Sequence, residues 1–326
     1  MDHNLPLVLS GITTRLGSEK LTAADLSAWY SAGQDDPTSA TGITALYHFA
    51  PHQNLLDVSV ACVRETLMHS SLSLREVGGL VATSNFTHET LVPTFGVAVA
   101  ARAGLASVRA GTIGTGCGGL AQAVEYAVSM MTSPFVGWDP KKVFVIIAGD
   151  AYSRHVDPKD YKTRYLFSEG VAVFILRFTR ATKGDLVVSR VASRSLVVDE
   201  SLEALTLGNS TFVEDRYFRM KTAPVVRFTR RALNITKEML GIGSWHGVTI
   251  IPHQANARLL AEMRRAVPEA HLFYTNGIAT IGNTLNASTV FGLEDVLTSD
   301  TASDDIVLVP FGAEWVVGAI QLRRQQ

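Results

Sequence analysis

The sequence predicts an α/β fold with mixed central sheets, and two observations carry this prediction. First, short apolar runs rich in β-branched residues alternate with segments whose apolar residues recur every three or four positions. Second, the pattern of residues 143–178, two buried strands around a loop, recurs at 305–324 with a shorter loop. The alternation favours helices packed on sheets, and the recurrence indicates a duplicated α/β unit.

The expected strands are short apolar runs bounded by turn-forming residues, and the expected helices lie between them. The strands cover 77–85, 143–150, 171–178, 248–253, 306–312 and 316–323, and the helices cover 55–72, 118–131, 225–240 and 256–267. We expect an N-terminal half, 1–180, and a C-terminal half, 181–326. The stretch 181–223 is more polar and less periodic, which predicts a connection or cap.

Composition excludes several classes of partner. The chain has 326 residues, 47% of them hydrophobic and 18% charged, with a formal net charge of −1. This near-neutral charge offers no field for nucleic acid or for an anionic membrane. The pattern of residues 1–17 is not typical of a signal peptide, and no apolar run is as long as a membrane span. We therefore expect a cytoplasmic protein whose partners are small molecules or proteins.

The two cysteines have different settings. Cys117 lies in the glycine-rich stretch GTIGTGCGGLAQ and directly precedes an expected helix, whose dipole would favour the thiolate. Cys62 lies within an apolar helical pattern and is expected to pack in the core. Two cysteines are too few for a disulfide framework or a thiolate metal site. A lone cysteine is more often a packing residue than a nucleophile, so other segments must decide the role of Cys117.

Two later residues complement the cysteine. His253 ends an expected buried strand just before a helix, a common place for sites in α/β proteins. Asn283 follows Gly282 in NGIATIGNTLNAST. Together the three side chains supply a nucleophile, an acid, base or hydrogen-bond donor, and a second donor.

The motifs around these residues resemble those of the thiolase superfamily, within it the ketoacyl-acyl carrier protein synthase III group. PHQAN (252–256) is followed thirty residues later by GNT (282–284), and the cysteine before a helix fits the same family. The resemblance extends over nearly the whole chain. It implies a five-layered αβαβα fold of two duplicated halves with mixed central sheets, and a homodimer or a heteromer with a related subunit.

The resemblance also implies a reaction. Cys117 would accept an acyl group from an acyl-CoA or acyl carrier protein thioester, and His253 and Asn283 would stabilise the enolate formed when a malonyl-type thioester loses carbon dioxide. The backbone N–H groups of Cys117 and Ala313 would form the oxyanion hole. The coenzyme A or phosphopantetheine thioesters are substrates, so no resident cofactor and no metal are expected.

Further roles follow from the family's positions. Val92, Phe311 and Gly312 are expected to line the acyl pocket, with Val92 replacing a bulky aromatic residue and reaching a partner subunit. Glu89 is a candidate second base, against the alternative of a solvated loop carboxylate. Arg227 and Arg258 are candidate contacts for a carrier protein or a phosphate, against the alternative of a solvated face.

The sequence departs from the family pattern in three further places. The closing loop reads Gly312, Ala313, Glu314 where the family carries three glycines. Asp36 and Ala40 stand in the segment that carries an adenine-clamping tryptophan and arginine in fatty acid initiation enzymes. A third departure, the replacement of glycine-aspartate-glycine by 168–170, is expected to be structural. These departures favour a specialised, secondary-metabolite pathway.

Two alternatives to the condensing enzyme stay open. One is an acyltransferase of the same fold that passes the acyl group to a hydroxyl or an amine. Asn283 disfavours it, because a carboxylate that orients His253 as a base would suit that transfer better. The other is a non-catalytic partner subunit of a condensing enzyme. No sequence pattern indicates the acyl donor and its chain length, the extender, the preference for coenzyme A or carrier protein, or any cyclisation of the product.

Overall fold

The computed structural model describes residues 5–28, 39, 41–85, 92–156, 164–196, 205–207, 218–220, 222–312 and 315–326. The strands within these residues are β1 (Leu7–Leu16), β2 (Glu19–Thr22), β3 (Ala45–His48), β4 (Val77–Thr83), β5 (Arg109–Ile113), β6 (Val143–Asp150), β7 (Gly170–Phe178), β8 (Leu186–Ser195), β9 (Leu205–Leu207), β10 (Phe218–Met220), β11 (Thr249–Pro252), β12 (Leu272–Phe273), β13 (Asp305–Val309) and β14 (Val316–Arg324). The helices are α1 (Ala23–Ser27), α3 (Leu55–His69), α4 (Phe95–Ala103), α5 (Gly119–Thr132), α7 (Thr222–Leu240), α8 (Ala257–Arg265), α9 (Asn276–Ile281) and α10 (Ser288–Thr298).

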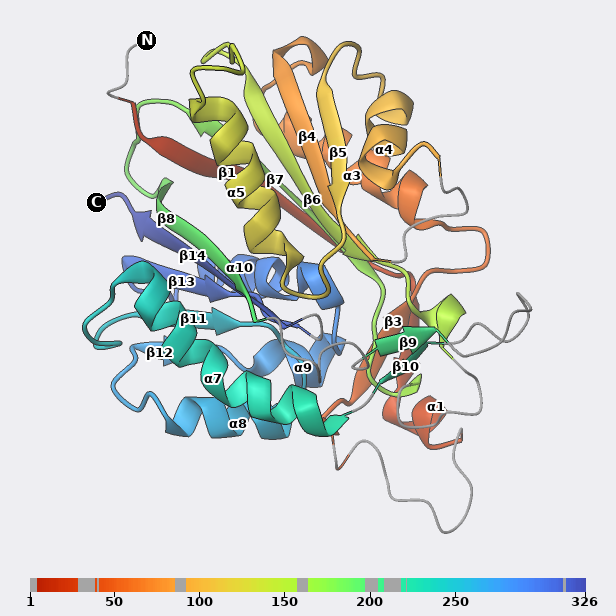
Figure 1. The fold of residues 1–326 in the computed structure, drawn as a ribbon. Helices are drawn as coiled ribbons and strands as arrows, with labels where there is room; N and C mark the ends of the chain where they lie inside the picture. The colour runs from red at the N-terminus through yellow and green to blue at the C-terminus, as the bar shows by residue number, and fades with distance from the viewer. Residues whose placement is uncertain are drawn as a thin grey trace.

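Two groups of five strands share one order. From the centre outward the first group runs β1-β7-β6-β4-β5, and the second runs β8-β14-β13-β11-β12 (Figure 1). In each group the outer pairs are parallel and the inner pairs are antiparallel. The groups join through β1 and β8 by only two residue pairs, Val8 with Val187 and Leu9 with Leu186. The mixed sheets of the predicted fold are therefore present, each built on the same plan.

Alternation along the strands separates three apolar cores. In β6, Phe144, Ile146 and Ala148 face a central core, whereas Val143, Val145 and Ile147 face an outer core with α3 and α4. The central core also contains buried residues of α5, α10 and the second sheet. A third core lies between the second sheet and the helices α7 and α8. Helices and sheets thus form five layers, which confirms the predicted fold class.

The six predicted strands and the four predicted helices all form, with shifted ends. The prediction that 181–223 is only a connection or cap was wrong, because Leu186–Ser195 is a central strand that pairs with β14 and β1. The burial pattern of β8 shows only one buried residue, Leu186, so its sequence lacks the apolar run that marks the other central strands. β1 was also not predicted from the sequence. The division into halves at 180 and 181 stays a prediction.

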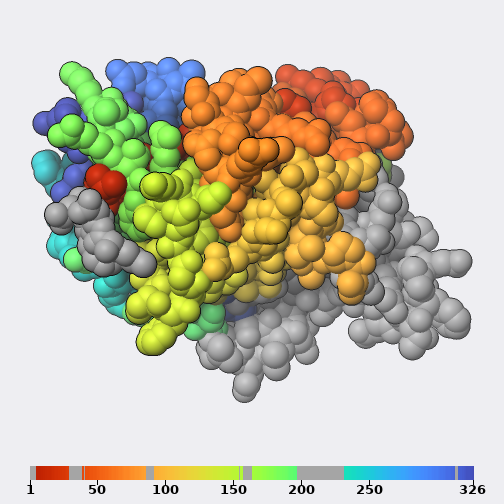
Figure 2. Space-filling view, turned by 90° about the horizontal axis from the view of Figure 1, so that it is seen from above, coloured from red at the N-terminus to blue at the C-terminus, as the bar shows by residue number. Residues whose placement is uncertain are grey.

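The strand order places the candidate site where strand ends meet. β4 and β6 are parallel neighbours, as are β11 and β13, so Thr83 and Asp150 lie near each other at one sheet edge and Pro252 and Val309 pair at the other. The face seen from above is made largely by the orange-to-yellow part of the chain, which contains α3, α4 and α5 (Figure 2). In Figure 1, α7 and α8 lie on the outer face of the second sheet.

Candidate active site

Cys117 lies in a tight turn between β5 and α5. Gly116 has a φ of 56°, and the N–H of Gly119 donates to the carbonyl of Gly116 at 3.2 Å, which closes the turn around the cysteine. A Cβ on Gly119 would lie 2.2 Å from Thr83 Oγ1, so only glycine permits this approach to β4. The thiol is half-buried at the N-terminal end of a 14-residue helix, where the helix dipole favours an anion. The expected setting of a nucleophile is therefore present.

Cys62 occupies a different environment, which confirms the core role expected for it. Its side chain is fully buried in the core between α3 and the first sheet. Burial raises the pKa of the Cys62 thiol to about 11. This thiol therefore stays protonated and serves as a packing group.

The segment PHQAN is held by hydrogen bonds of three of its residues, His253, Gln254 and Asn256. Pro252 ends β11, and the His253 N–H donates to the carbonyl of Val309 at 2.9 Å. Gln254 is buried and its amide donates to the carbonyls of Pro252 and Tyr274, at 2.9 and 3.2 Å. The Asn256 side chain caps α8 by accepting from the N–H of Arg258 at 2.8 Å. The motif thus holds the histidine on a rigid strand end.

Burial and one short contact define the state of the His253 ring. The residue is 3% exposed, and its Nδ1 lies 2.6 Å from Ser288 Oγ. Burial lowers the pKa of His253 to about 3, although a hydrogen bond with the Leu285 backbone acts in the opposite direction. The imidazole is therefore neutral at pH 7, so one of its nitrogens carries a proton and the other accepts.

Asn283 is held by backbone contacts on both sides. Its N–H donates to the carbonyl of Leu166 at 3.0 Å, and its carbonyl accepts from the N–H of Ser168 at 2.9 Å. Its side-chain oxygen accepts from the N–H of Leu285 at 2.9 Å, which leaves the amide group as the side-chain donor. Gly282 precedes it with a φ of 71°, and a Cβ there would lie 2.5 Å from Leu46 Cδ2. The glycine and the asparagine of the GNT motif are both explained by this packing.

The closing loop joins these segments. The rings of His253 and Phe311 meet edge to face, with their centroids 5.4 Å apart. A Cβ on Gly312 would lie 2.5 Å from the backbone nitrogen of Cys117. Cys117 also packs against the core that contains Phe311, Phe167 and Leu285. Two consecutive residues therefore touch the histidine and the cysteine, which stand 136 positions apart in the sequence.

The segment 168–170 supports the asparagine, as the structural reading of this departure expects. Glu169 is fully buried and accepts from the Phe49 N–H at 2.5 Å and from the Ser153 hydroxyl at 2.5 Å. The Ser168 hydroxyl accepts from the Tyr47 N–H at 2.9 Å. The segment therefore ties β3 and the loop after β6 to the backbone of Asn283.

Three polar residues near the site had no predicted role. Ser288 contacts the His253 ring, while Asp150 and Asn286 are buried and hydrogen-bonded to each other, with Asn286 Nδ2 donating to Asp150 Oδ2 at 2.8 Å. The sequence carried one signal for Asp150, a charged residue at the end of the apolar run VFVIIAGD. Asn286 and Ser288 stand three and five residues after Asn283, but no sequence pattern indicates which way their side chains point.

The remaining predicted residues have different placements. Val92 is 86% exposed on this chain, so its role in an acyl pocket stays a prediction that involves a partner subunit. Arg258 is exposed in the first turn of α8, and Arg227 belongs to α7, whose first residues are described by backbone alone. Glu89, Ala313, Asp36 and Ala40 lie outside the described residues.

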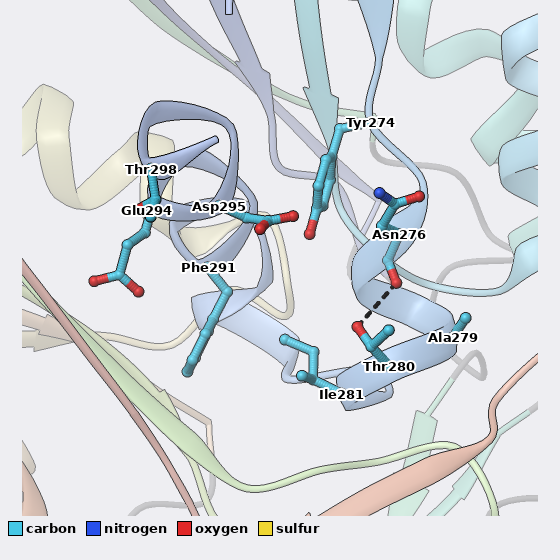
Figure 3. A pocket seen from close by; sticks show the side chains of 9 residues that line it. All are labelled: Tyr274, Asn276, Ala279, Thr280, Ile281, Phe291, Glu294, Asp295 and Thr298. Atoms are coloured by element: carbon cyan, nitrogen blue, oxygen red, sulfur yellow. Dashed lines mark hydrogen bonds between the residues drawn. The ribbon is translucent and has the colours of Figure 1, made fainter. Parts of the chain in front are cut away.

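A separate pocket of about 550 Å³ opens between α9 and α10 (Figure 3). It is lined by Tyr274, Asn276, Ala279, Thr280, Ile281, Phe291, Glu294, Asp295 and Thr298. Burial, followed by contact with Asp295, raises the pKa of the Tyr274 hydroxyl, so the tyrosine is neutral. Cys117, His253 and Asn283 do not line this pocket, which is therefore distinct from the candidate active site.

Two features are absent from the described part of the chain. No group of three or more histidine, cysteine, aspartate or glutamate side chains is arranged to hold a metal ion there. Among the described helices, none combines the length and the apolar character needed to cross a membrane.

Comparison with known proteins gives one consistent result. Residues 113–195 match the family model of 3-oxoacyl-[acyl-carrier-protein] synthase III. The chain is 26% identical over 336 residues to the beta-ketoacyl-[acyl-carrier-protein] synthase III of Nitratidesulfovibrio vulgaris, covering 98% of this chain and 99% of that one.

Solved structures show the same fold. The 3-oxoacyl-(acyl carrier protein) synthase III of Pseudomonas aeruginosa superposes with a TM-score of 0.83 at 23% identity, covering 98% of this chain and 99% of that chain. The priming β-ketosynthase of the R1128 polyketide pathway superposes with a TM-score of 0.82 at 17% identity, covering 99% and 98%. By its motifs, fold and full-length similarity, the chain is similar to the 3-oxoacyl-[acyl-carrier-protein] synthase III enzymes, which are condensing acyltransferases.

Proposed function

We propose that the chain joins an acyl group to a malonyl-type thioester by decarboxylative condensation, with Cys117 as nucleophile. The observation that carries the proposal is the closing loop, in which Phe311 contacts the His253 ring and Gly312 abuts the Cys117 backbone. These two contacts support a shared role for His253 and Cys117 in one reaction. The thioester bond already activates the acyl carbonyl group toward attack, so the proposed reaction uses no resident cofactor.

In the first step the Cys117 thiolate attacks the carbonyl carbon of an acyl thioester. A C–S bond forms to the cysteine, the carbonyl oxygen takes up negative charge, and the coenzyme A or carrier thiolate then leaves. The backbone N–H of Cys117 would stabilise this oxyanion, and that of Ala313 is the proposed second donor. The product of the step is acyl-Cys117.

In the second step a malonyl-type thioester loses carbon dioxide. The electron pair of the broken C–C bond forms an enolate, whose oxygen would accept hydrogen bonds from His253 and Asn283. If the Ser288 hydroxyl donates to Nδ1 of His253, the neutral ring keeps its proton on Nε2 and can donate there. The enolate carbon attacks the acyl-Cys117 carbonyl, the thiolate leaves, and a β-ketoacyl thioester is released.

The state of the histidine separates this reaction from the alternative acyl transfer to an alcohol. A general base needs a partner that stabilises its protonated form, as a carboxylate does. His253 has a serine as its ring partner, and its lowered pKa disfavours protonation. The condensing reaction, which uses a neutral donor, is therefore the better match.

The finer assignments are part of the proposal. A carrier protein or coenzyme A delivers the acyl and malonyl groups, and a cytoplasmic homodimer is the proposed form. A specialised pathway is supported by the departures at 36, 40 and 312–314 from the family pattern.

The test is a panel of acyl thioesters followed by intact-protein mass spectrometry. We expect an acyl adduct on the wild type, none on Cys117→Ala, and carbon dioxide release on addition of a malonyl thioester. The matched control is Cys62→Ala, which removes the buried thiol. An adduct with no carbon dioxide but with transfer to an alcohol would favour the acyltransferase, and no adduct across the panel would favour the partner subunit.

A further inference from the structure

A buried carboxylate lies between the segments that carry the candidate catalytic residues. Asp150 ends β6 and is 1% exposed. Its Oδ1 accepts from the Ser84 hydroxyl at 3.2 Å and from the Asn85 N–H at 2.9 Å. Its Oδ2 accepts from the N–H and the Nδ2 of Asn286, at 3.2 and 2.8 Å. Both oxygens are thus occupied by donors from two different parts of the chain.

On the first side the contacts lead to the nucleophile. Asn85 Oδ1 accepts from the N–H of Gly116 at 3.0 Å, and Gly116 is the residue before Cys117. The N–H of Ser84 donates to the carbonyl of Ile113 at 3.2 Å, at the other end of the same loop. Asp150 therefore anchors the residues that follow β4, and these residues are hydrogen-bonded to the loop that carries Cys117.

On the second side the contacts lead to the proposed donors. Asn286 lies between Asn283 and Ser288, the residue that contacts the His253 ring. Its Oδ1 accepts from Thr83 Oγ1 at 3.0 Å, so both ends of its amide are bonded within the buried region. The amide therefore fixes the short turn from Leu285 to Ala287 against the ends of β4 and β6.

The charge state of Asp150 suits this role. Burial raises the pKa of Asp150 to about 6, against the opposite effect of hydrogen bonds from Asn85, Asn286 and Ser84. The carboxylate is therefore mostly ionised at pH 7, and an ionised carboxylate accepts from all four donors.

We propose that Asp150 is a positioning residue that, through Asn85 and Asn286, fixes the nucleophile loop relative to the segment carrying Asn283 and Ser288. The inference rests on the proposed function for its kinetic consequences, but the linkage itself concerns the placement of Cys117 in any chemistry. Because reacting groups must be placed to within about 1 Å, a shift of either segment lowers the rate while leaving substrate contacts in place.

The test compares isosteric variants by single-turnover kinetics. Asp150→Asn places an NH₂ group against N–H donors, so we expect acylation of Cys117 and decarboxylation of a malonyl thioester each to slow by about 10- to 100-fold, with KM changed by less than about 3-fold. Asn85→Ala removes only the contact with Gly116, so acylation should slow more than decarboxylation. In the exchange variant, D150N with N286D, the amide at position 150 can donate to the carboxylate at position 286. This variant should recover part of the lost acylation and decarboxylation rates.

Thr249→Val is the matched control, since Thr249 is fully buried and bonded to Ser303 Oγ at the opposite end of β11 from His253. It should lower the melting temperature without the kinetic losses. Normal rates in folded Asp150→Asn, or equal losses in Thr249→Val, would overturn the proposal. If Asp150→Asn does not fold, Asn85→Ala decides alone: the unequal loss supports the positioning role, and unchanged or equally reduced rates overturn it.

The rate at which iodoacetamide alkylates Cys117, located by peptide mapping, provides a readout that needs no substrate. We expect this rate to change by at least about 5-fold in Asp150→Asn and to be unaltered in Thr249→Val. If the wild type forms no adduct and releases no carbon dioxide, the proposed function fails, and the alkylation rate then decides the positioning role. An alkylation rate equal to that of the wild type would in that case overturn the positioning role as well.

Discussion

At the scale of single residues, the charge of His253 links the candidate site to stability. The pKa of about 3 in the folded chain lies below the ordinary histidine value of 6.5, so the unfolded chain binds the proton first as the pH falls. The contribution of this neutral imidazole to stability is complete above pH 6.5 and is lost between pH 6.5 and about 3. The same burial that keeps the His253 imidazole neutral therefore makes the fold sensitive to acid.

We expect His253→Gln to reduce this sensitivity. Between pH 6 and 4 the free energy of unfolding of the wild type should fall more steeply than that of the variant, by about 1.4 kcal/mol per pH unit. Urea denaturation at several pH values measures both slopes. Equal slopes would show that the buried imidazole does not titrate differently in the folded and unfolded chain.

At the scale of elements, the closing loop depends on one glycine. A Cβ on Gly312 would also lie 3.0 Å from the Cα and the Cβ of Cys117, in addition to its contact with the nitrogen, so Gly312→Ala must displace the loop or the nucleophile. We expect the rate of Cys117 acylation to fall by about 100-fold, because the geometry of the proposed oxyanion hole would be lost. Gly243→Ala is the matched control, since a Cβ at Gly243 meets no atom within 4 Å. An equal effect of the two substitutions on acylation would contradict this account.

The first turn of α8 carries the proposed contact with a carrier protein. We expect Arg258→Glu, at an exposed position, to lower kcat/KM for a carrier-bound malonyl group by about 10-fold. If Arg258 contacts the carrier protein itself, kcat/KM for the coenzyme A thioester should change by less than about 3-fold. Arg180→Glu, an exposed substitution in the connection after β7, is the control. A parallel loss with both substrates would instead indicate contact with the phosphate that they share.

At the scale of the whole molecule, the central layer determines how the sheets unfold. The sheets share few hydrogen bonds, two residue pairs between β1 and β8, but they share one apolar core around α5 and α10. Because each sheet buries one face in that core, loss of one sheet exposes the other. We therefore expect a single cooperative transition in urea. Trp138 belongs to the central core, and Trp245 belongs to the core under α7 and α8. The variants Trp138→Phe and Trp245→Phe each remove one of these two fluorescent reporters. The unfolding midpoint from tryptophan fluorescence should be the same in both variants and equal to the midpoint measured by circular dichroism. Separate midpoints would show that the sheets unfold independently.

The sequence alone determined the candidate nucleophile, the two candidate donors and most of the central strands. Local patterns carry this information, because a buried strand needs an apolar run, a cap needs a polar side chain, and PHQAN and GNT are short motifs. β8 was missed for the same reason, since its central position depends on β1 and β14 and not on an apolar run of its own.

Only the tertiary structure decided which polar groups support the site. Asp150 and Asn286 stand 136 residues apart, and Asp150 and Ser84 stand 66 apart. Their hydrogen bonds exist because the strand order brings the ends of β4 and β6 beneath the turn that follows Asn283. No local pattern encodes a contact whose partners are chosen by sheet order, whereas burial makes each such contact costly to lose.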